Sequence, residues 1–270
     1  MFLAGAECPF TCSFCDLWRW TLDGPTPVGA LPVQLSRVLT ALPAPIPDRL
    51  KLYNASNFFD YRAVPQEDLP RIAELAEPFA AVTVESHANT IGPVTLEFAA
   101  LLSGQLEVAV GLETIHSVAA QHLNKRLDLA RFDRAAAFLA DHRIDLRAFV
   151  LLGAPYVPAA ESIEWTVRTA LYAAAHGAGR IAIIPVRGGN GEMERLQGLG
   201  DFVPPTLAQL EAALERCLAL APPPAVVTAD LWDIERLPAC AACRSRRVAR
   251  LERLNLTGSL EPAVSCSACA

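Results

Sequence analysis

The chain has 270 residues, of which 52% are hydrophobic and 19% are charged, and its formal net charge is −6 at pH 7. This composition supplies a large core and excludes a disordered chain, and the acidic balance argues against a globally basic nucleic-acid binder. We find no signal peptide and no apolar run of the roughly 18 residues that a membrane span needs. We therefore expect a cytoplasmic protein without membrane contact, in which clustered thiols bind metal rather than form disulfides.

Short aliphatic runs alternate with longer amphipathic stretches along most of the chain, a rhythm that is typical of repeated βα units around a parallel sheet. The expected strands are Phe2–Ala4, Leu50–Tyr53, Ala81–Glu85, Glu107–Gly111, Leu146–Gly153 and Arg180–Pro185. The expected helices are Pro32–Leu42, Glu67–Ala76, Val94–Leu102, Leu129–His142, Ala159–His176 and Leu207–Leu220.

Six βα units predict an α/β fold, a partial (β/α)6 barrel with a small cysteine-rich C-terminal extension. The proline run at 222–224 cannot continue a helix and divides the chain into an expected core barrel, 1–221, and a C-terminal module, 222–270. Only seven residues precede Cys8, which is short for a buried strand and its lead-in. The sequence therefore raises the hypothesis that Met1 is an internal start.

Three cysteines, Cys8, Cys12 and Cys15, follow the first expected strand in the spacing C-x3-C-x2-C. Three thiolates from one loop hold three irons of a [4Fe-4S] cluster and leave the fourth iron open to another ligand. A zinc site would need a fourth protein ligand, and none lies nearby in the sequence. The spacing therefore predicts an iron-sulfur cluster with one open iron.

Polar side chains stand at the ends of the expected strands, where a parallel barrel forms its site. Asn54, Ser56 and Asn57 follow the second strand, Glu85 ends the third, and Glu113 follows the fourth. Glycines and further polar residues follow the fifth and sixth strands. Packing alone does not readily explain a polar or glycine residue at every strand end, so we expect a site on this face.

These residues resemble the radical SAM superfamily, whose hallmark after the first strand is C-x3-C-x-aromatic-C. Cys8, Cys12, Phe14 and Cys15 match it position by position. The resemblance implies that S-adenosylmethionine (SAM) chelates the open iron. It further implies that a flavodoxin-type or ferredoxin-type protein supplies the electron, and that cleavage of SAM yields a 5′-deoxyadenosyl radical.

The stretch 110–114, followed by 123–126, looks like the segment that binds SAM ribose and carboxylate in members related to the Elongator catalytic subunit and the tRNA methylthiotransferases. The usual Gly-Gly-Glu after the second strand is absent, and the segment 54–57 stands in its place. The implied SAM contacts are therefore Phe14, Asn54, Ser56, Asn57, Glu85, Glu113 and Arg126.

Four of these side chains also have a purely structural interpretation. Phe14 also fits as a core aromatic residue, Glu85 and Glu113 as partners in structural ion pairs, and Arg126 as a solvated charge at the start of a helix. His87 is expected to be a hydrogen-bonded residue at a strand end, with a contact to the substrate or cofactor as the alternative.

A second cysteine group lies near the C-terminus, where two C-x2-C pairs are separated by 22 residues. Four thiolates suit either a tetrahedral zinc ion or a second [4Fe-4S] cluster. Because the chain is already expected to carry one cluster, the second cluster is slightly favoured. The expected ligands are Cys240, Cys243, Cys266 and Cys269, whereas Cys217 is expected to be a buried hydrophobic residue.

An arginine-rich stretch, 244–255, runs between the two cysteine pairs, and Arg247, Arg250 and Leu254 lie on neighbouring turns of an expected helix. The simplest interpretation is a solvated helix face. A contact with tRNA phosphates or with an acidic electron donor is the functional alternative.

The sequence thus predicts a radical SAM enzyme that abstracts hydrogen from an unidentified substrate. One alternative is an RNA-modifying (tRNA-modifying) member of the same superfamily. Another is a non-catalytic iron-sulfur or zinc protein for electron transfer, although such a carrier would not need polar groups at every strand end.

Overall fold

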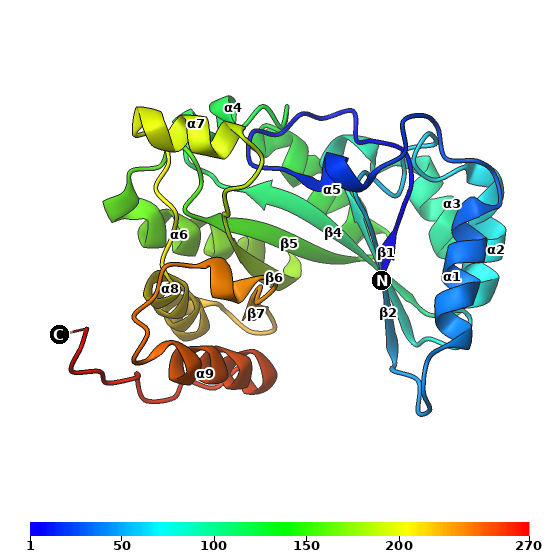
Figure 1. Cartoon of the computed structure of the whole chain (residues 1–270). Helices are drawn as coiled ribbons and strands as arrows, with labels where there is room; N and C mark the ends of the chain where they lie inside the picture. Colours follow the sequence, from blue (N-terminus) through cyan, green and yellow to red (C-terminus); the bar gives the residue numbers. More distant parts are fainter. Residues whose placement is uncertain (270) are drawn as a thin grey trace. The chain divides into compact units, whose positions relative to one another are not determined.

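The computed structural model describes residues 1–269 and contains one seven-stranded sheet with helices between the strands (Figure 1). The strands follow chain order, and β1 pairs with β2, β2 with β3, β3 with β4 and β6 with β7, all in parallel. The expected α/β class is confirmed. The strands are β1 Phe2–Leu3, β2 Arg49–Asn54, β3 Ala81–Ser86, β4 Gln105–Glu113, β5 Asp145–Leu152, β6 Ala178–Pro185 and β7 Val226–Ala229.

Every helix expected from the sequence is present, with ends that differ by up to three residues. Two helices, α4 and α7, and the strand β7 were not expected; β7 has only four residues and follows a proline run, so it gives little periodic signal. The helices are α1 Ala30–Thr40, α2 Leu69–Ala76, α3 Pro93–Leu101, α4 Ser117–His122, α5 Leu129–Asp141, α6 Ser162–Ala175, α7 Glu192–Leu199, α8 Leu207–Leu220 and α9 Arg244–Thr257.

The chain divides into two compact units. The first consists of residues 1–11, 15–111 and 130–146, and the second of residues 12–14, 112–129 and 147–270. The predicted division at 221/222 stays a prediction. Within the second unit, β7 pairs with β6 and α9 packs against α8, so elements from both sides of the proline run share one compact unit.

In the first unit, β3 is almost entirely buried, as is most of β4. Such near-continuous burial is typical of parallel strands that are covered on both faces. Phe58, Phe59 and Phe98 form an aromatic cluster in this unit, with ring centroids 4.9 to 6.4 Å apart. The segment after β2 is therefore anchored by Phe58 and Phe59, which fixes the polar residues that precede them.

In the second unit, a hydrophobic cluster brings together Leu123, Leu151, Val186, Met193 and Phe202. This cluster joins the end of β5, the segment after β6 and helix α7 to the loop after α4. Among residues 1–269, no helix combines the length and the apolar character that crossing a bilayer requires.

Candidate functional site

The three N-terminal cysteines lie in the loop after β1. Cys8, Cys12 and Cys15 are all half-buried thiols, and none of them forms a disulfide. In the first unit, the Asn57 side-chain nitrogen Nδ2 donates a hydrogen bond to the Cys8 sulfur at 3.4 Å. Their role as cluster ligands stays a prediction, and Asn57 is placed as a neighbour of one predicted ligand.

In the second unit, the middle of the cysteine loop is held from two sides. The Ser13 backbone nitrogen donates to the Leu123 carbonyl at 3.0 Å, and the Asn190 side chain donates to the Ser13 carbonyl at 2.8 Å. Asn190 in turn accepts a hydrogen bond from the backbone of Met193 at the start of α7. The sequence did not single out Asn190, because nothing local links it to a loop 177 residues earlier.

Asn57 is buried and links the segment after β2 to the end of β3. Its side-chain oxygen accepts a hydrogen bond from the His87 backbone at 2.7 Å, while its nitrogen faces Cys8. The Phe58 backbone donates to the Glu85 carbonyl at 2.9 Å, which continues this link. Asn57 is thus a positioning residue for the cysteine loop, with both polar atoms of its side chain engaged.

Asn54 and Ser56 present the opposite situation. Asn54 is buried, and neither polar atom of its side chain has a hydrogen-bond partner within the described part of the chain; the same holds for the Ser56 hydroxyl. Buried polar atoms are normally paired, because leaving one unpaired costs about 1–3 kcal/mol. The segment that stands in place of Gly-Gly-Glu thus holds three buried polar atoms that could bind a polar ligand.

Glu85 and His87 have protein partners of their own. The Glu85 carboxylate accepts a hydrogen bond from the Asn54 backbone at 3.1 Å, which fixes the end of β2. The His87 ring stacks on Phe10 with centroids 3.9 Å apart, and its Nδ1 accepts from the Asn89 backbone at 3.1 Å. The expectation of a hydrogen-bonded strand-end histidine is met, and Phe10 of the cysteine loop is a contact that the sequence did not reveal.

In the second unit, Glu113 pairs with Lys125 at 2.7 Å, with both side chains largely buried. The backbone is left-handed at Glu113, Asn124 and Arg126, with φ of 65°, 55° and 57°. Such conformations are costly for residues other than glycine and tend to persist at binding sites. The structure thus favours the ion-pair interpretation of Glu113, whereas Arg126 lies on the surface.

Phe14 is half-buried and packs against the hydrophobic cluster of the second unit. This contact accounts for part of its surface, as the core interpretation expected. A SAM contact for Phe14, Asn54, Ser56, Asn57, Glu85, Glu113 or Arg126 stays a prediction.

The four C-terminal cysteines come together within the second unit. The sulfur atoms of Cys240, Cys243, Cys266 and Cys269 all lie within 4.8 Å of one another, and the Cys243 and Cys269 sulfurs are 3.5 Å apart. Each C-x2-C pair closes a turn, because the backbone of Cys243 donates to the Cys240 carbonyl and that of Cys269 to the Cys266 carbonyl. The chain therefore offers four soft ligands to one metal centre, and Cys217 is buried in α8 as expected.

This proximity shifts the thiol pKa values. A hydrogen bond with the Cys269 thiol lowers the pKa of Cys240 to about 7, and the same pairing raises the pKa of Cys269 to about 12. Near neutral pH, Cys240 therefore readily becomes a thiolate while Cys269 keeps its proton. The thiolate is the form that binds metal.

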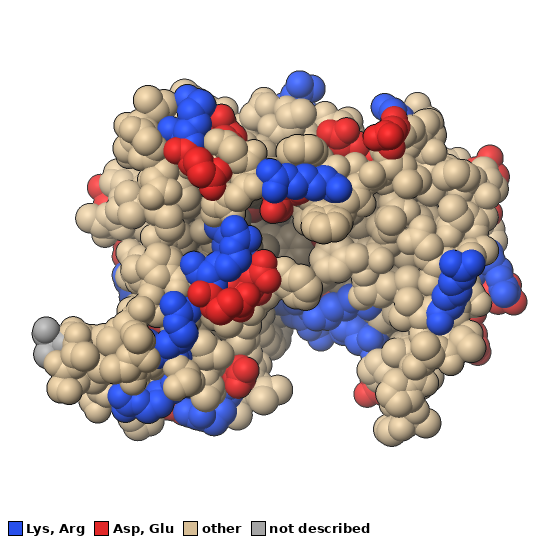
Figure 2. Space-filling model, viewed as in Figure 1, with Lys and Arg blue, Asp and Glu red and all other residues tan. Residues whose placement is uncertain are grey.

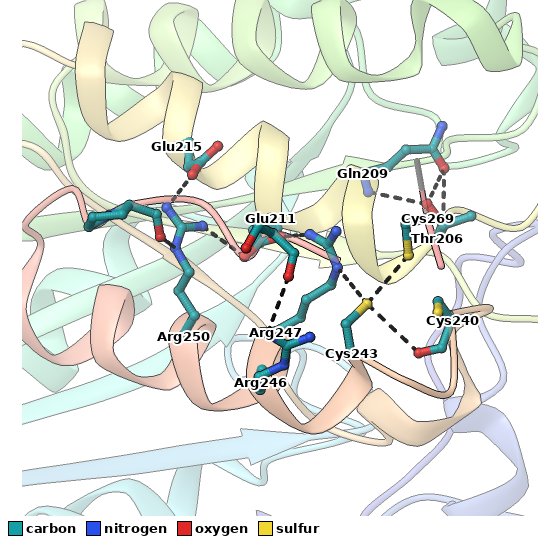
Figure 3. A network of polar contacts seen from close by, with 12 residues as sticks. Thr206, Gln209, Glu211, Glu215, Cys240, Cys243, Arg246, Arg247, Arg250 and Cys269 are labelled. Carbon is teal, nitrogen blue, oxygen red and sulfur yellow. Dashed lines mark hydrogen bonds and ion pairs between the residues drawn. The ribbon is translucent and has the colours of Figure 1, made fainter. Parts of the chain in front are cut away.

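Two of the arginines of α9, Arg247 and Arg250, are not part of a solvated face. Arg250 is buried, and it pairs with Glu211 at 2.8 Å and also with Glu215 (Figure 3). Arg247 pairs with Glu211 and donates from Nε to the Cys243 sulfur at 3.3 Å. The expectation of a solvated stripe is wrong for these two residues, because α8 packs against α9 and brings its carboxylates to them.

Positive and negative charges lie side by side on part of the surface. Figure 2 shows some Lys and Arg side chains beside Asp and Glu, and other Lys and Arg side chains without an acidic neighbour on the face in view. Arg253, which is exposed, pairs with Glu261 at 3.0 Å. A test of RNA binding through Arg247 or Arg250 would therefore disturb internal ion pairs as well as any phosphate contact.

No family model and no curated protein matches this chain. Solved structures do resemble it. SuiB of Streptococcus suis matches with a TM-score of 0.60 at 14% identity, and the match covers 90% of this chain and 49% of the SuiB chain. Archaeal Elp3 of Methanocaldococcus infernus matches with a TM-score of 0.54 at 14% identity, and the match covers 83% of this chain and 57% of the Elp3 chain.

Methylornithine synthase, PylB, has a TM-score of 0.55 at 13% identity, and the match covers 97% of this chain and 82% of PylB. The chain thus spans about half the length of Elp3 and SuiB and most of PylB. At 13% to 14% identity, these matches show that the chain shares its fold with Elp3, SuiB and PylB.

Proposed function

We propose that this chain is a radical SAM enzyme whose cluster is held by Cys8, Cys12 and Cys15. The observation that carries the proposal is the position of the C-x3-C-x2-C loop, which directly follows β1 in a fold shared with radical SAM enzymes. When bound, the [4Fe-4S] cluster and SAM supply a 5′-deoxyadenosyl radical that abstracts hydrogen from a substrate of unknown identity.

The residues after β2 fit SAM. The unpaired Asn54 amide offers both a donor and an acceptor, and the Ser56 hydroxyl offers either. An ammonium group needs acceptors and a carboxylate needs donors, so this pair suits the methionine end of SAM in place of the Gly-Gly-Glu segment. Glu85 supports them through its contact with the Asn54 backbone.

Two further contacts position the residues of the proposed site. Asn57 orients Cys8 by donating to its sulfur, and the Glu113–Lys125 pair fixes the start of the segment that we assign to SAM.

A small reducing protein of the flavodoxin or ferredoxin type supplies the electron. Because the cluster thiolates need a reducing compartment, we place the reaction in the cytoplasm. The C-terminal cysteines add a second metal centre, a zinc ion or a second cluster.

Anaerobic reconstitution tests the proposal. We expect the reconstituted protein to release 5′-deoxyadenosine from SAM when dithionite is added, as measured by liquid chromatography. The Cys12→Ala variant should lose this activity, because one iron loses its ligand. The Cys217→Ala variant, altered at a cysteine buried in α8, is the matched control and should keep it. Deoxyadenosine formation by Cys12→Ala would disprove the assignment.

A further inference from the structure

The spacing of the four C-terminal sulfurs distinguishes between the two kinds of metal centre. A tetrahedral zinc ion with bonds of about 2.3 Å to sulfur places its ligands about 3.8 Å apart. All four sulfurs of Cys240, Cys243, Cys266 and Cys269 lie within 4.8 Å of one another. A [4Fe-4S] cluster inserts four irons and four sulfides among its ligand sulfurs and so holds them further apart. The observed spacing therefore matches a single ion.

The surroundings of the site suit a thiolate centre that is closed by the protein. Four thiolates around a divalent ion carry an excess of two negative charges, and Arg247, in the first turn of α9, donates to the sulfur of Cys243, which directly precedes that helix. Arg247 is itself fixed by Glu211 of α8, as Figure 3 shows. Hydrogen bonds of this kind orient ligands and balance their charge.

The site also connects the end of the chain to α9. Residues 258–265 contain no helix or strand, and arginines hold them through backbone carbonyls. Arg250 donates from Nε to the Pro262 carbonyl at 2.8 Å, and Arg246 donates to that of Ser265 at 3.2 Å. Cys266 and Cys269 come directly after these residues, and their sulfurs lie close to those of Cys240 and Cys243, which precede α9.

We propose that Cys240, Cys243, Cys266 and Cys269 bind one structural zinc ion that fastens the tail 258–269 to α9, with Arg247 as the charge partner of Cys243. The site closes a loop between two C-x2-C turns and supplies four protein ligands. Such a site stabilises the fold and leaves no open position for a substrate. The sulfur spacing thus reverses the slight preference for a second cluster.

Metal analysis of a full-length variant tests this independently of the proposed reaction. The triple variant Cys8→Ala, Cys12→Ala and Cys15→Ala lacks the N-terminal ligands. After anaerobic treatment with iron and sulfide, we expect it to retain one zinc and no iron per chain by mass spectrometry. Cobalt substitution should produce the visible absorption of a tetrahedral thiolate site. Four irons with sulfide, or no bound metal, would overturn the proposal.

The wild-type chain gives a second measurement in case the triple variant fails to fold. One zinc per chain alongside the iron is expected, whereas eight irons without zinc would contradict the proposal. If the N-terminal cluster fails to form, the zinc count still decides the C-terminal site, so failure of the proposed enzyme activity remains distinguishable.

Proteolysis tests the structural role. Removal of zinc by a chelator, or Cys266→Ser, should release the tail and accelerate cleavage within residues 258–269. Cys217→Ser is the matched control, because this thiol lies in α8 and not among the four ligands. The Arg247→Gln variant should still bind one zinc ion. A competing chelator should remove this zinc at least several-fold faster than from the wild type. An equally protected tail with and without zinc would show that the ion does not fasten it.

Discussion

The Asn57 side chain donates a hydrogen bond to the sulfur of Cys8 over 3.4 Å. Replacing Asn57 with Leu removes this donor and also leaves the buried His87 backbone nitrogen without its acceptor. We expect the free energy of unfolding to fall by about 1–3 kcal/mol. The cluster potential should also fall, because hydrogen bonds to sulfur help to set it. Urea titration and anaerobic redox titration measure these two effects, and an unchanged potential would show that Cys8 is not a ligand.

Replacing Asn54 should weaken SAM binding without lowering stability, in contrast to the replacement of Asn57. In Asn54→Leu, a side chain of similar size replaces an amide that has no partner, so we expect stability to be kept or raised. The dissociation constant for SAM should rise by about tenfold, the equivalent of one lost hydrogen bond. Equilibrium dialysis of the reconstituted protein measures the SAM affinity.

Asn255→Leu is the matched control for this experiment. The Asn255 amide donates to and accepts from the backbone of Ala229 at 2.8 Å in each direction. This variant should therefore lose stability and keep its SAM affinity. If the SAM affinity of Asn54→Leu equalled that of the wild type, the assignment of this segment to SAM binding would be wrong.

Removing only one partner of the Glu113–Lys125 pair should destabilise the fold strongly. Lys125→Met leaves the largely buried carboxylate of Glu113 without its partner, which costs about 3–5 kcal/mol. The double variant Glu113→Gln and Lys125→Met should regain much of this loss. Urea denaturation measures both. Arg195→Met, which breaks an exposed pair with Glu192, is the control and should change little.

Arg250 should matter for folding far more than its exposed neighbour. Arg250→Met leaves Glu211 without one of its partners and removes the contacts with the tail, so we expect a loss of about 3–5 kcal/mol. Arg253→Met, in the same helix but exposed, is the matched control and should cost less than about 1 kcal/mol. Similar melting temperatures for the two variants would contradict a buried network.

Alkylation with iodoacetamide should distinguish the cysteines by pH in the metal-free protein. Only the thiolate reacts, and the lowered pKa of Cys240 means that its thiolate fraction rises as the pH passes about 7. Burial raises the pKa of Cys217 to about 12, so this thiol should stay unmodified in the folded chain. Mass spectrometry of peptides across a pH series measures the extent of alkylation at Cys240 and at Cys217. Reaction of Cys217 before Cys240 would be inconsistent with the structure.

Much of the fold was predictable because it rests on local patterns. The alternation of strands and helices, the buried α8 cysteine and the helix around Arg247 all follow from short-range periodicity. The strand β7 could not be predicted in this way, because four residues are too few for a clear periodic pattern and the strand forms by pairing with β6.

The sequence by itself determined the chemistry that was available: two groups of cysteines with metal-binding spacing and polar residues after the strands. Only the tertiary structure decided which of these groups meet. It placed Asn57 on Cys8, Lys125 on Glu113, and the carboxylates of α8 on Arg247 and Arg250. Spacing along the chain sets which residues of one loop or helix are neighbours, whereas ion pairs and sulfur contacts between distant segments depend on how the elements pack.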